Sequence, residues 1–332
     1  MQINRSVLEN KVIDCHNHLG VCIKSYSRLE YPYAETLESI YHKQLSAGVD
    51  VSIVFPFSSN LFFNFRTLIS KGLNVADRKP VSEVPYAVEN TLVMREIFEF
   101  NPELKNRFIP FVSVDTERKI DGQVKFLESL EKKYPVYGIK INPTAAQSRI
   151  SCLLNKGKAF LKYAEERNIP FLFHTSPVPE DYYSHVKDTL KVIEKSPGIR
   201  FGLAHAIVFH KGYLDIAAGM PNVWVDTAAL KIQVDVFNIR KLSKIYQAID
   251  ADFSDHKKVM QKLMELYPDK IIWGSDSPAY AYICRRRQGK NTFMDFNYKG
   301  TYKDEKDALD ALPGPLKKKA CNTNTLNWLF GK

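Results

Sequence analysis

Long hydrophobic runs are missing from this sequence of 332 residues. No stretch approaches the ~20 consecutive apolar residues of a membrane-spanning helix, so we expect no membrane partner. Residues 1–10 also lack the apolar segment of a signal peptide. The five cysteines are odd in number and form no Cys-x-x-Cys pair, which argues against a disulfide framework. The expectation is a cytoplasmic protein with reduced thiols.

Nucleic-acid-binding motifs are absent as well, although the formal net charge is +10. Lysines are spread along the whole chain, and only residues 285–287 and 317–319 form tight basic clusters. No helix-turn-helix, zinc-finger or RNP pattern accompanies them, so most of this charge is assigned to a solvated surface. We therefore expect a small-molecule substrate and no nucleic-acid partner. A non-catalytic binding protein stays the third-ranked hypothesis, which metal-free protein with salt-sensitive DNA or RNA binding would revive.

Linkers, low-complexity segments and internal repeats are also missing, and residues 1–332 are expected to form a single domain. The sequence does contain short β-rich runs separated by amphipathic stretches, such as 35–47, 88–100, 123–133 and 156–167. Nearly all-apolar strands that alternate with helices predict a parallel sheet buried on both faces. Eight strands are expected, at 11–16, 49–55, 107–114, 136–142, 169–174, 199–205, 222–226 and 270–275. Eight such units favour an α/β fold of the closed (β/α)8 TIM-barrel type.

Two further features bear on this architecture. No glycine-rich phosphate loop follows the first strand, which weakens the alternative of an open dinucleotide-binding sheet. Long loops follow the second, seventh and eighth strands, at 56–86, 227–268 and 277–302. Because pockets of barrel enzymes form at the C-terminal strand ends, these loops are expected to contact substrate. For the Phe-rich first loop, packing or oligomer contacts are an equal alternative.

Polar side chains stand at the ends of several of these strands. His16 and His18 close the first strand, and side chains two residues apart on a strand share a face. His174 and His205 close the fifth and sixth strands, and Asp276 follows the eighth. Because parallel strand ends converge on one rim of a barrel, these five residues predict a metal site there.

These residues and the motifs around them resemble the amidohydrolase superfamily of metal-dependent barrels. The motifs are similar to those of the amidohydrolase-2 branch, which also includes the aminocarboxymuconate-semialdehyde decarboxylase-like enzymes. The resemblance is nearly full length, and its motifs lie at 13–18, 138–143, 173–175, 203–206, 222–227, 273–278 and 322–331. It implies the superfamily and the fold, and it says little about substrate.

The resemblance also implies roles for individual residues. His16, His18, His174 and Asp276 would be metal ligands, with Asp276 also the proton acceptor for a water. His205 would be a second-metal ligand or an acid/base residue that touches the substrate. One divalent ion is preferred to two, with zinc first and manganese as the alternative.

Three further residues are substrate-binding candidates. Lys140 could be a carboxylated bridge between two metals, as in binuclear relatives, but a cation for the substrate is the favoured role. Asn142 shares its strand face and replaces a histidine common in that branch. Arg285 represents the basic loop residues 285–287 and Lys290, which suit an anionic substrate, although a solvated basic loop is the simpler alternative for each.

The resulting prediction is a metal-dependent hydrolase in which Asp276 acts as base and His205 assists. A metal-activated water would cleave an amide, ester or lactone bond of a small, anionic substrate. The alternative is a metal-dependent decarboxylase of the aminocarboxymuconate-semialdehyde decarboxylase-like type, which uses the same residues. A homo-oligomer is expected from the branch alone.

Overall fold

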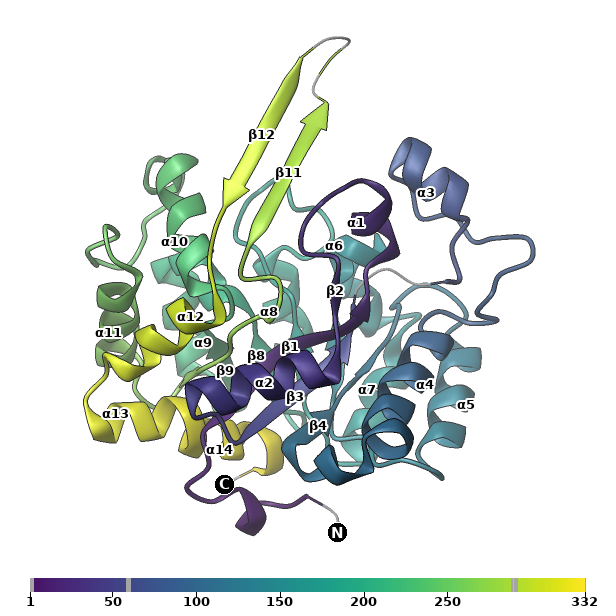
Figure 1. The fold of residues 1–332 in the computed structure, drawn as a ribbon, viewed down its shortest axis with the longest axis horizontal. Helices are drawn as coiled ribbons and strands as arrows, with labels where there is room; N and C mark the ends of the chain where they lie inside the picture. The colour runs from purple at the N-terminus through teal and green to yellow at the C-terminus, as the bar shows by residue number, and fades with distance from the viewer. Residues whose placement is uncertain (1–2, 58–60, 288, 290–291, 332) are drawn as a thin grey trace.

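A computed structural model describes residues 3–57, 61–287, 289 and 292–331. Its centre is a ring of parallel strands surrounded by helices (Figure 1), which confirms the expected TIM barrel. All eight expected strands are present. They are β1 (Ile13–Val21), β3 (Val51–Pro56), β4 (Phe108–Pro110) with its continuation β5 (Val112–Ser113), β6 (Ile139–Ile141), β7 (Phe171–Phe173), β8 (Phe201–Leu203), β9 (Val223–Asp226) and β10 (Ile271–Ile272).

Parallel pairing runs from β1 through β3 to β4 and from β5 through β6, β7, β8 and β9 to β10. The ring closes between its first and last strands. Cys15 N donates to the carbonyl of Trp273 at 3.0 Å, and Asp276 N donates to the carbonyl of His16 at 2.8 Å. These two bonds set the first strand beside the segment after β10, so residues from opposite ends of the chain become neighbours.

The helices follow the amphipathic stretches. They are α1 (Ile23–Ser27), α2 (Leu37–Ala47), α3 (Phe65–Lys71), α4 (Ala87–Arg95), α5 (Ile120–Leu130), α6 (Pro143–Ala146), α7 (Lys158–Glu166), α8 (Val186–Glu194), α9 (Lys211–Gly219), α10 (Leu230–Ile239), α11 (His256–Leu266), α12 (Tyr302–Asp310), α13 (Gly314–Lys318) and α14 (Asn324–Phe330). Short 3-10 segments span Ser6–Leu8, Pro102–Arg107, Ile150–Leu154, His205–Phe209 and Leu242–Lys244, and π-helical turns span Glu96–Phe100 and Lys319–Thr323. No helix among these described residues is long and apolar enough to cross a bilayer.

Helix α2 shows how the local sequence sets an element's ends. Thr36 precedes it, and the Thr36 hydroxyl accepts from Ser39 N at 3.2 Å, so a free backbone donor of the first turn is bonded. Gly48 ends it with φ of 63°, a left-handed conformation that glycine adopts without a Cβ penalty. The buried face of α2 carries Leu37 and Ile40 against the barrel.

The apolar core has one layer between strands and helices and a second inside the barrel. Within the barrel Phe111, Leu172 and Trp224 pack with Trp328 from α14. The Trp328 indole N–H also donates to the carbonyl of Phe171 at 3.3 Å, at the N-terminal end of β7. Helix α14 therefore covers the bottom of the barrel and leaves the C-terminal strand ends for a pocket.

The three long connections contain folded elements. The first carries α3 and leads into α4, the second carries α10 and α11, and the third forms the antiparallel hairpin β11 (Tyr282–Arg287) and β12 (Phe293–Tyr298). In Figure 1 this hairpin projects from the side of the molecule opposite the two termini. The small strand β2 (Ala34–Glu35) pairs with the end of β1 below it. What looked like a loop after the eighth strand is thus a two-stranded wall.

Candidate metal centre

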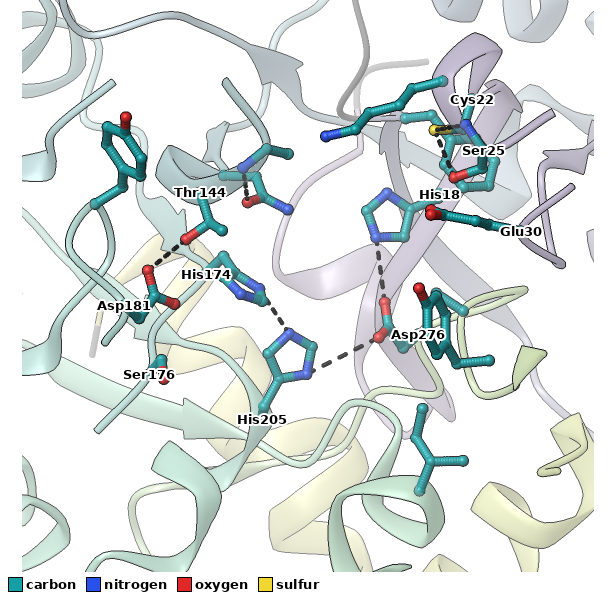
Figure 2. Close-up of a pocket in the computed structure, with 18 of the residues that line it drawn as sticks. His18, Cys22, Ser25, Glu30, Thr144, His174, Ser176, Asp181, His205 and Asp276 are labelled. Atoms are coloured by element: carbon teal, nitrogen blue, oxygen red, sulfur yellow. Dashed lines mark hydrogen bonds and ion pairs between the residues drawn. The ribbon is translucent and has the colours of Figure 1, made fainter. Parts of the chain in front are cut away.

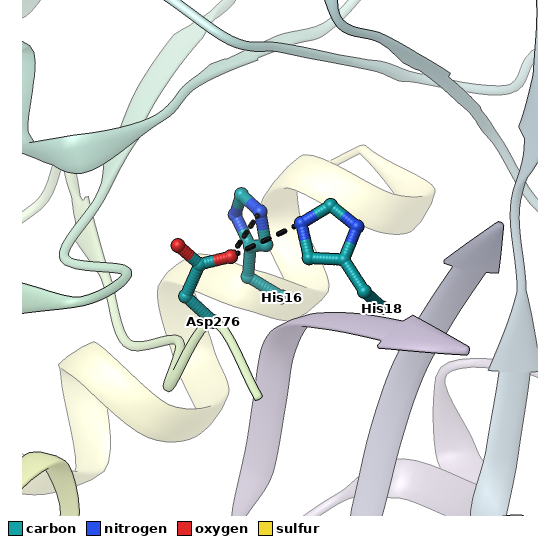
Figure 3. Close-up of side chains that lie close together, drawn as sticks. All are labelled: His16, His18 and Asp276. Carbon is teal, nitrogen blue, oxygen red and sulfur yellow. Dashed lines mark ion pairs between the residues drawn. The ribbon is translucent and has the colours of Figure 1, made fainter. Parts of the chain in front are cut away.

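Three of the expected ligands converge at the C-terminal end of the barrel. His16, His18 and Asp276 are buried, and one ligand atom from each lies within 4.8 Å of the others. Figure 3 shows the two imidazoles facing one oxygen of the carboxylate. The Nε2 atoms of His16 and His18 each stand 3.2 Å from Asp276 Oδ1. Two imidazole nitrogens and a carboxylate oxygen form a donor set typical of zinc and related divalent ions.

A residue outside the expected ligand set orients His16. Asp226, at the end of β9, lies 2.7 Å from His16 Nδ1, and both side chains are buried. A carboxylate at this position accepts a hydrogen bond from Nδ1–H. The proton therefore stays on Nδ1, and Nε2 keeps a lone pair directed at the centre. The carboxylate also accepts from His205 N and Ala228 N, at 2.8 and 3.0 Å. Its place at a strand end was the signal that could have found it.

The polar atoms at the centre fit a cation. With the His16 proton on Nδ1, its Nε2 lone pair faces an Asp276 oxygen, an arrangement that needs positive charge between the two atoms. Asp276 Oδ1 and His18 Nδ1 are buried and have no hydrogen-bond partner among the described residues. Burial and the Lys140 charge lower the pKa of His16, but the two carboxylates outweigh them and raise it, so the site attracts a proton or a metal ion.

His174 and His205 form a second pair beside this group (Figure 2). His205 Nδ1 lies 3.0 Å from the carbonyl of Ala228, and because a carbonyl only accepts, that nitrogen carries its proton. His205 Nε2 then accepts from His174 Nδ1 at 2.9 Å, which leaves His174 Nε2 as an acceptor. Burial, followed by the charge of His205, lowers the pKa of His174 well below its usual value. A neutral His174 suits a ligand, and its place as a fourth ligand stays a prediction.

The backbone near the centre is left-handed at Asp276 and along the whole run from His205 to Phe209. His205 and Asp276 have φ of 66° and 65°, in the left-handed region that residues with a Cβ rarely adopt. Such conformations persist where the surroundings hold them. The adjacent Ser275 is fixed by Asp14, which accepts from its backbone N–H at 2.9 Å and its hydroxyl at 2.6 Å. Asp14 therefore fastens β1 to the segment that carries Asp276 and does not line the pocket.

The two candidates on β6 and directly after it, Lys140 and Asn142, both reach the pocket. Lys140 is buried, and its Nζ lies 3.2 Å from His16 Nε2 and 4.9 Å from the centre of the Phe55 ring. Burial lowers its pKa to about 8. Asn142 lines the same pocket, and its side-chain oxygen accepts from Ala145 N at 3.0 Å to cap α6. Lys140 is therefore the deeper of the two and lies next to the centre.

The pocket has a volume of about 1030 Å³ and contains all five expected strand-end residues in its lining. One prediction for its wall is wrong. Arg285 lies on the outer face of the hairpin, exposed and paired with Asp295 at 2.6 Å, and is not among the residues that line the pocket. Side chains alternate along a strand, so the neighbouring Arg286 faces the pocket instead. Lys290 lies outside the described residues.

Sequence comparison identifies the family. The model of the amidohydrolase family (Amidohydrolase 2) matches residues 90–329, which is more than half of the chain. The chain belongs to the amidohydrolase family. The match includes His174, His205 and Asp276 and begins after His16 and His18. A search of the curated proteins finds no match for this amidohydrolase.

Solved structures share its fold over nearly the whole length. A TIM-barrel protein of Bordetella bronchiseptica is 12% identical, with TM-score 0.57 and coverage of 96% of this chain and 98% of the other. A probable 2-pyrone-4,6-dicarboxylic acid hydrolase of Acinetobacter baumannii is 13% identical, with TM-score 0.55 and coverage of 97% and 100%. The IDCase of Metarhizium anisopliae is 12% identical, with TM-score 0.54 and coverage of 98% of each chain.

Proposed function

We propose that this amidohydrolase is a metal-dependent hydrolase that cleaves an amide, ester or lactone bond of a small, anionic substrate. The observation that supports it is the convergence of His16, His18 and Asp276 on one point, at the bottom of a pocket large enough for such a molecule. These residues would hold one divalent ion, with zinc preferred and His174 as a further ligand. When bound, the ion supplies Lewis acidity, which lowers the pKa of water toward ~7 and polarises a carbonyl.

The chain's own groups can carry the proton transfers. One oxygen of Asp276 faces the two imidazoles, and the other, Oδ2, lies 3.9 Å from His205 Nδ1. Burial favours the neutral acid, but the electrostatic influence of His16, together with His18 and His205, outweighs it and holds the pKa of Asp276 well below its usual value. The ionised carboxylate can accept a proton from water and deliver it to the leaving group.

His205 and Lys140 would assist from two sides. The bonds of His205 to the Ala228 carbonyl and to His174 fix its ring beside Asp276. In this position His205 would assist Asp276, because its Nδ1–H, 3.9 Å from Asp276 Oδ2, helps to keep that carboxylate ionised. Lys140 would place an ammonium group next to the reacting carbonyl, where it attracts developing negative charge.

Elemental analysis of the purified chain tests the metal centre. We expect about one zinc or manganese per chain, and loss of most of it in His16→Ala and in Asp276→Ala. His42→Ala, a histidine outside the pocket lining, serves as the matched control and should keep the metal. Absence of metal in every preparation, including reconstituted protein, would contradict the proposal.

Decarboxylation is the second candidate, because the buried Lys140 ammonium could equally bind a substrate carboxylate beside the metal ligands. The two reactions differ in their use of water. A panel of lactones, esters, amides and aromatic carboxylic acids should be assayed in ¹⁸O-labelled water with simultaneous measurement of carbon dioxide. Incorporation of ¹⁸O into the product supports hydrolysis, whereas carbon dioxide release without incorporation replaces it with the alternative.

A further inference from the structure

One wall of the pocket gathers positive charge around a single buried carboxylate. Glu30, in the segment after α1, has its Oε1 3.4 Å from Arg28 Nε and 3.5 Å from Arg286 Nε. Lys24 lies close enough for its pKa to respond to both arginines and to Glu30. All four side chains line the pocket that contains the metal centre. Figure 2 shows Glu30 on the side of the pocket where His18 lies, across from Thr144 and Asp181.

The single negative charge of Glu30 does not neutralise the three cationic side chains around it. Three positive side chains face one negative side chain, so the group carries an excess of positive charge. Glu30 is 7% exposed, yet its Oε1 accepts no hydrogen bond within the described part of the chain. Burial and then the charge of Arg28 lower the pKa of Lys24, as expected where cations crowd one another. An anion that enters this wall would relieve that repulsion.

Arg286 is held in position by aromatic rings of the hairpin. Its guanidinium lies 5.3 Å from the centre of the Tyr282 ring and 5.5 Å from that of Phe296. Cation–π contacts of this kind orient a guanidinium without consuming its N–H donors. Among the described residues, the polar partners of Arg286 are Glu30, at 3.5 Å, and the Cys284 side chain, so part of its five-donor fork can still bind a ligand. Two nitrogens of the outer neighbour Arg285 are already engaged by Asp295, at 2.6 and 2.9 Å.

We propose that Lys24, Arg28 and Arg286 form a binding site for a dianionic group of the substrate, remote from the reacting bond, with Glu30 as the internal counter-ion. A phosphate monoester or two adjacent carboxylates would match the two uncompensated charges. Guanidinium forks bind either kind of oxyanion bidentately. The inference rests on the proposed function only in that the reacting bond would lie at the metal centre.

Isothermal titration calorimetry on the metal-loaded, full-length chain tests this site. Inorganic phosphate, malonate and acetate serve as probes for a phosphate, a dicarboxylate and a monoanion. We expect phosphate or malonate to bind at least about tenfold more tightly than acetate, and the tighter of the two identifies the source of the dianion. Arg28→Gln and Arg286→Gln should each weaken binding about tenfold, which corresponds to about 1.4 kcal/mol.

Arg285→Gln is the matched control, because it removes the same charge from the other face of the same strand. Its affinity should stay within about twofold of the wild type, since exposed and distant charges are screened. Glu30→Gln should tighten binding severalfold, a gain that a folding defect cannot mimic. Equal effects of Arg285→Gln and Arg286→Gln, or acetate binding as tight as phosphate, would overturn the proposal. If the anion bound at the metal instead, Arg285→Gln and Arg286→Gln would change its affinity equally. Elemental analysis reports on the metal centre independently, so failure of the proposed function and failure of this anion site can be told apart.

Discussion

The base and the wall of the pocket are built in different ways. At the base, His16 and Asp226 are buried and lie 2.7 Å apart, and Asp226 also accepts from two backbone N–H groups. At the wall, Arg28 and Arg286 are about one-third to one-half exposed and stand 3.4 to 3.5 Å from Glu30. At the base, several short hydrogen bonds fix the position of the Asp226 carboxylate and the His16 ring. At the wall, the charged groups lie near one another but beyond normal hydrogen-bond length.

This difference suits two tasks. A metal ion requires ligand atoms held within a few tenths of an ångström, which only buried and multiply bonded side chains provide. A substrate's outer group is better served by long side chains that adapt to it, on segments beyond the rigid strands. Substitutions at the base should therefore have larger effects than equivalent substitutions at the wall.

Asp226→Asn should have the largest effect on metal affinity. The Asn oxygen can still accept from His205 N and Ala228 N, but its NH2 group would then face the His16 Nδ1 proton. Loss of that acceptor disturbs the His16 tautomer, and metal affinity should fall about 10- to 100-fold. Competition with a chelator of known affinity measures it. Asp252 is an exposed carboxylate paired with Lys258, so the control variant Asp252→Asn should leave the metal affinity unchanged. Equal metal affinities in the wild type and both variants would show that Asp226 does not orient His16.

Glu89→Gln probes the connection after β3, where Glu89 accepts from Leu61 N and its other oxygen is buried with no hydrogen-bond partner among the described residues. Burial raises the pKa of Glu89 from 4.5 to about 7. Between these values the folded state holds a proton that the unfolded state has released, so wild-type stability should fall as pH rises from 4.5 to 7. Glutamine does not titrate. The variant should therefore gain up to about 3 kcal/mol relative to the wild type across this window.

Urea unfolding at pH 5 and pH 8 measures this linkage, with the difference between the two proteins taken at each pH. Glu103→Gln, an exposed glutamate of the 3-10 segment Pro102–Arg107, provides the comparison and should show the same difference at both values. A Glu89→Gln difference that does not grow with pH would show that the carboxyl is ionised throughout.

Gly274→Ala tests how closely the first and last strands approach at the base. A Cβ at Gly274 would lie 2.7 Å from His16 Cβ and 3.1 Å from Cys15 Sγ. The side chains must shift, and we expect a loss of about 2 kcal/mol in the free energy of unfolding together with weaker metal binding. Gly219→Ala, whose Cβ would meet nothing within 4 Å, should be neutral or slightly stabilising in thermal unfolding. Equal melting temperatures for the two variants would contradict the tight packing.

Arg285→Ala should have the smallest effect. Its ion pair with Asp295 is largely exposed, and solvent screening leaves such pairs with little effect on stability. The melting temperature should stay close to that of the wild type, and the double variant Arg285→Ala/Asp295→Ala should match the single one closely. A large drop in melting temperature would mean that the outer face of the hairpin carries a structural role like that of the base.

Much of the barrel could be predicted because its strands are almost continuously apolar. All eight expected strands formed, since a strand buried on both faces requires such runs. The convergence of His16, His18 and Asp276 could be predicted for a related reason: residues at the C-terminal ends of barrel strands meet on one rim. The pairing of His174 with His205 could not, because it depends on ring orientation and on the Ala228 carbonyl.

The error at the wall has a specific cause. The sequence shows a basic cluster at residues 285–287, but a hairpin's facing residues depend on where its strands begin and which side packs inward. Pairing of Arg286 with Met294 and of Arg285 with Asp295 places the two arginines on opposite faces. The role of Glu30 was hidden for a similar reason, because it meets Arg286 across more than 250 residues.

The sequence by itself determined the barrel, the order of its strands and the end at which the histidines and Asp276 gather, because these follow from the period and polarity of the chain. Only the tertiary structure decided that Asp226 fixes the tautomer of His16, that Arg286 and not Arg285 faces the pocket, and that Glu30 has more cations than it can neutralise. Such relations depend on distances between residues far apart in the chain, and these are set by packing rather than by local pattern.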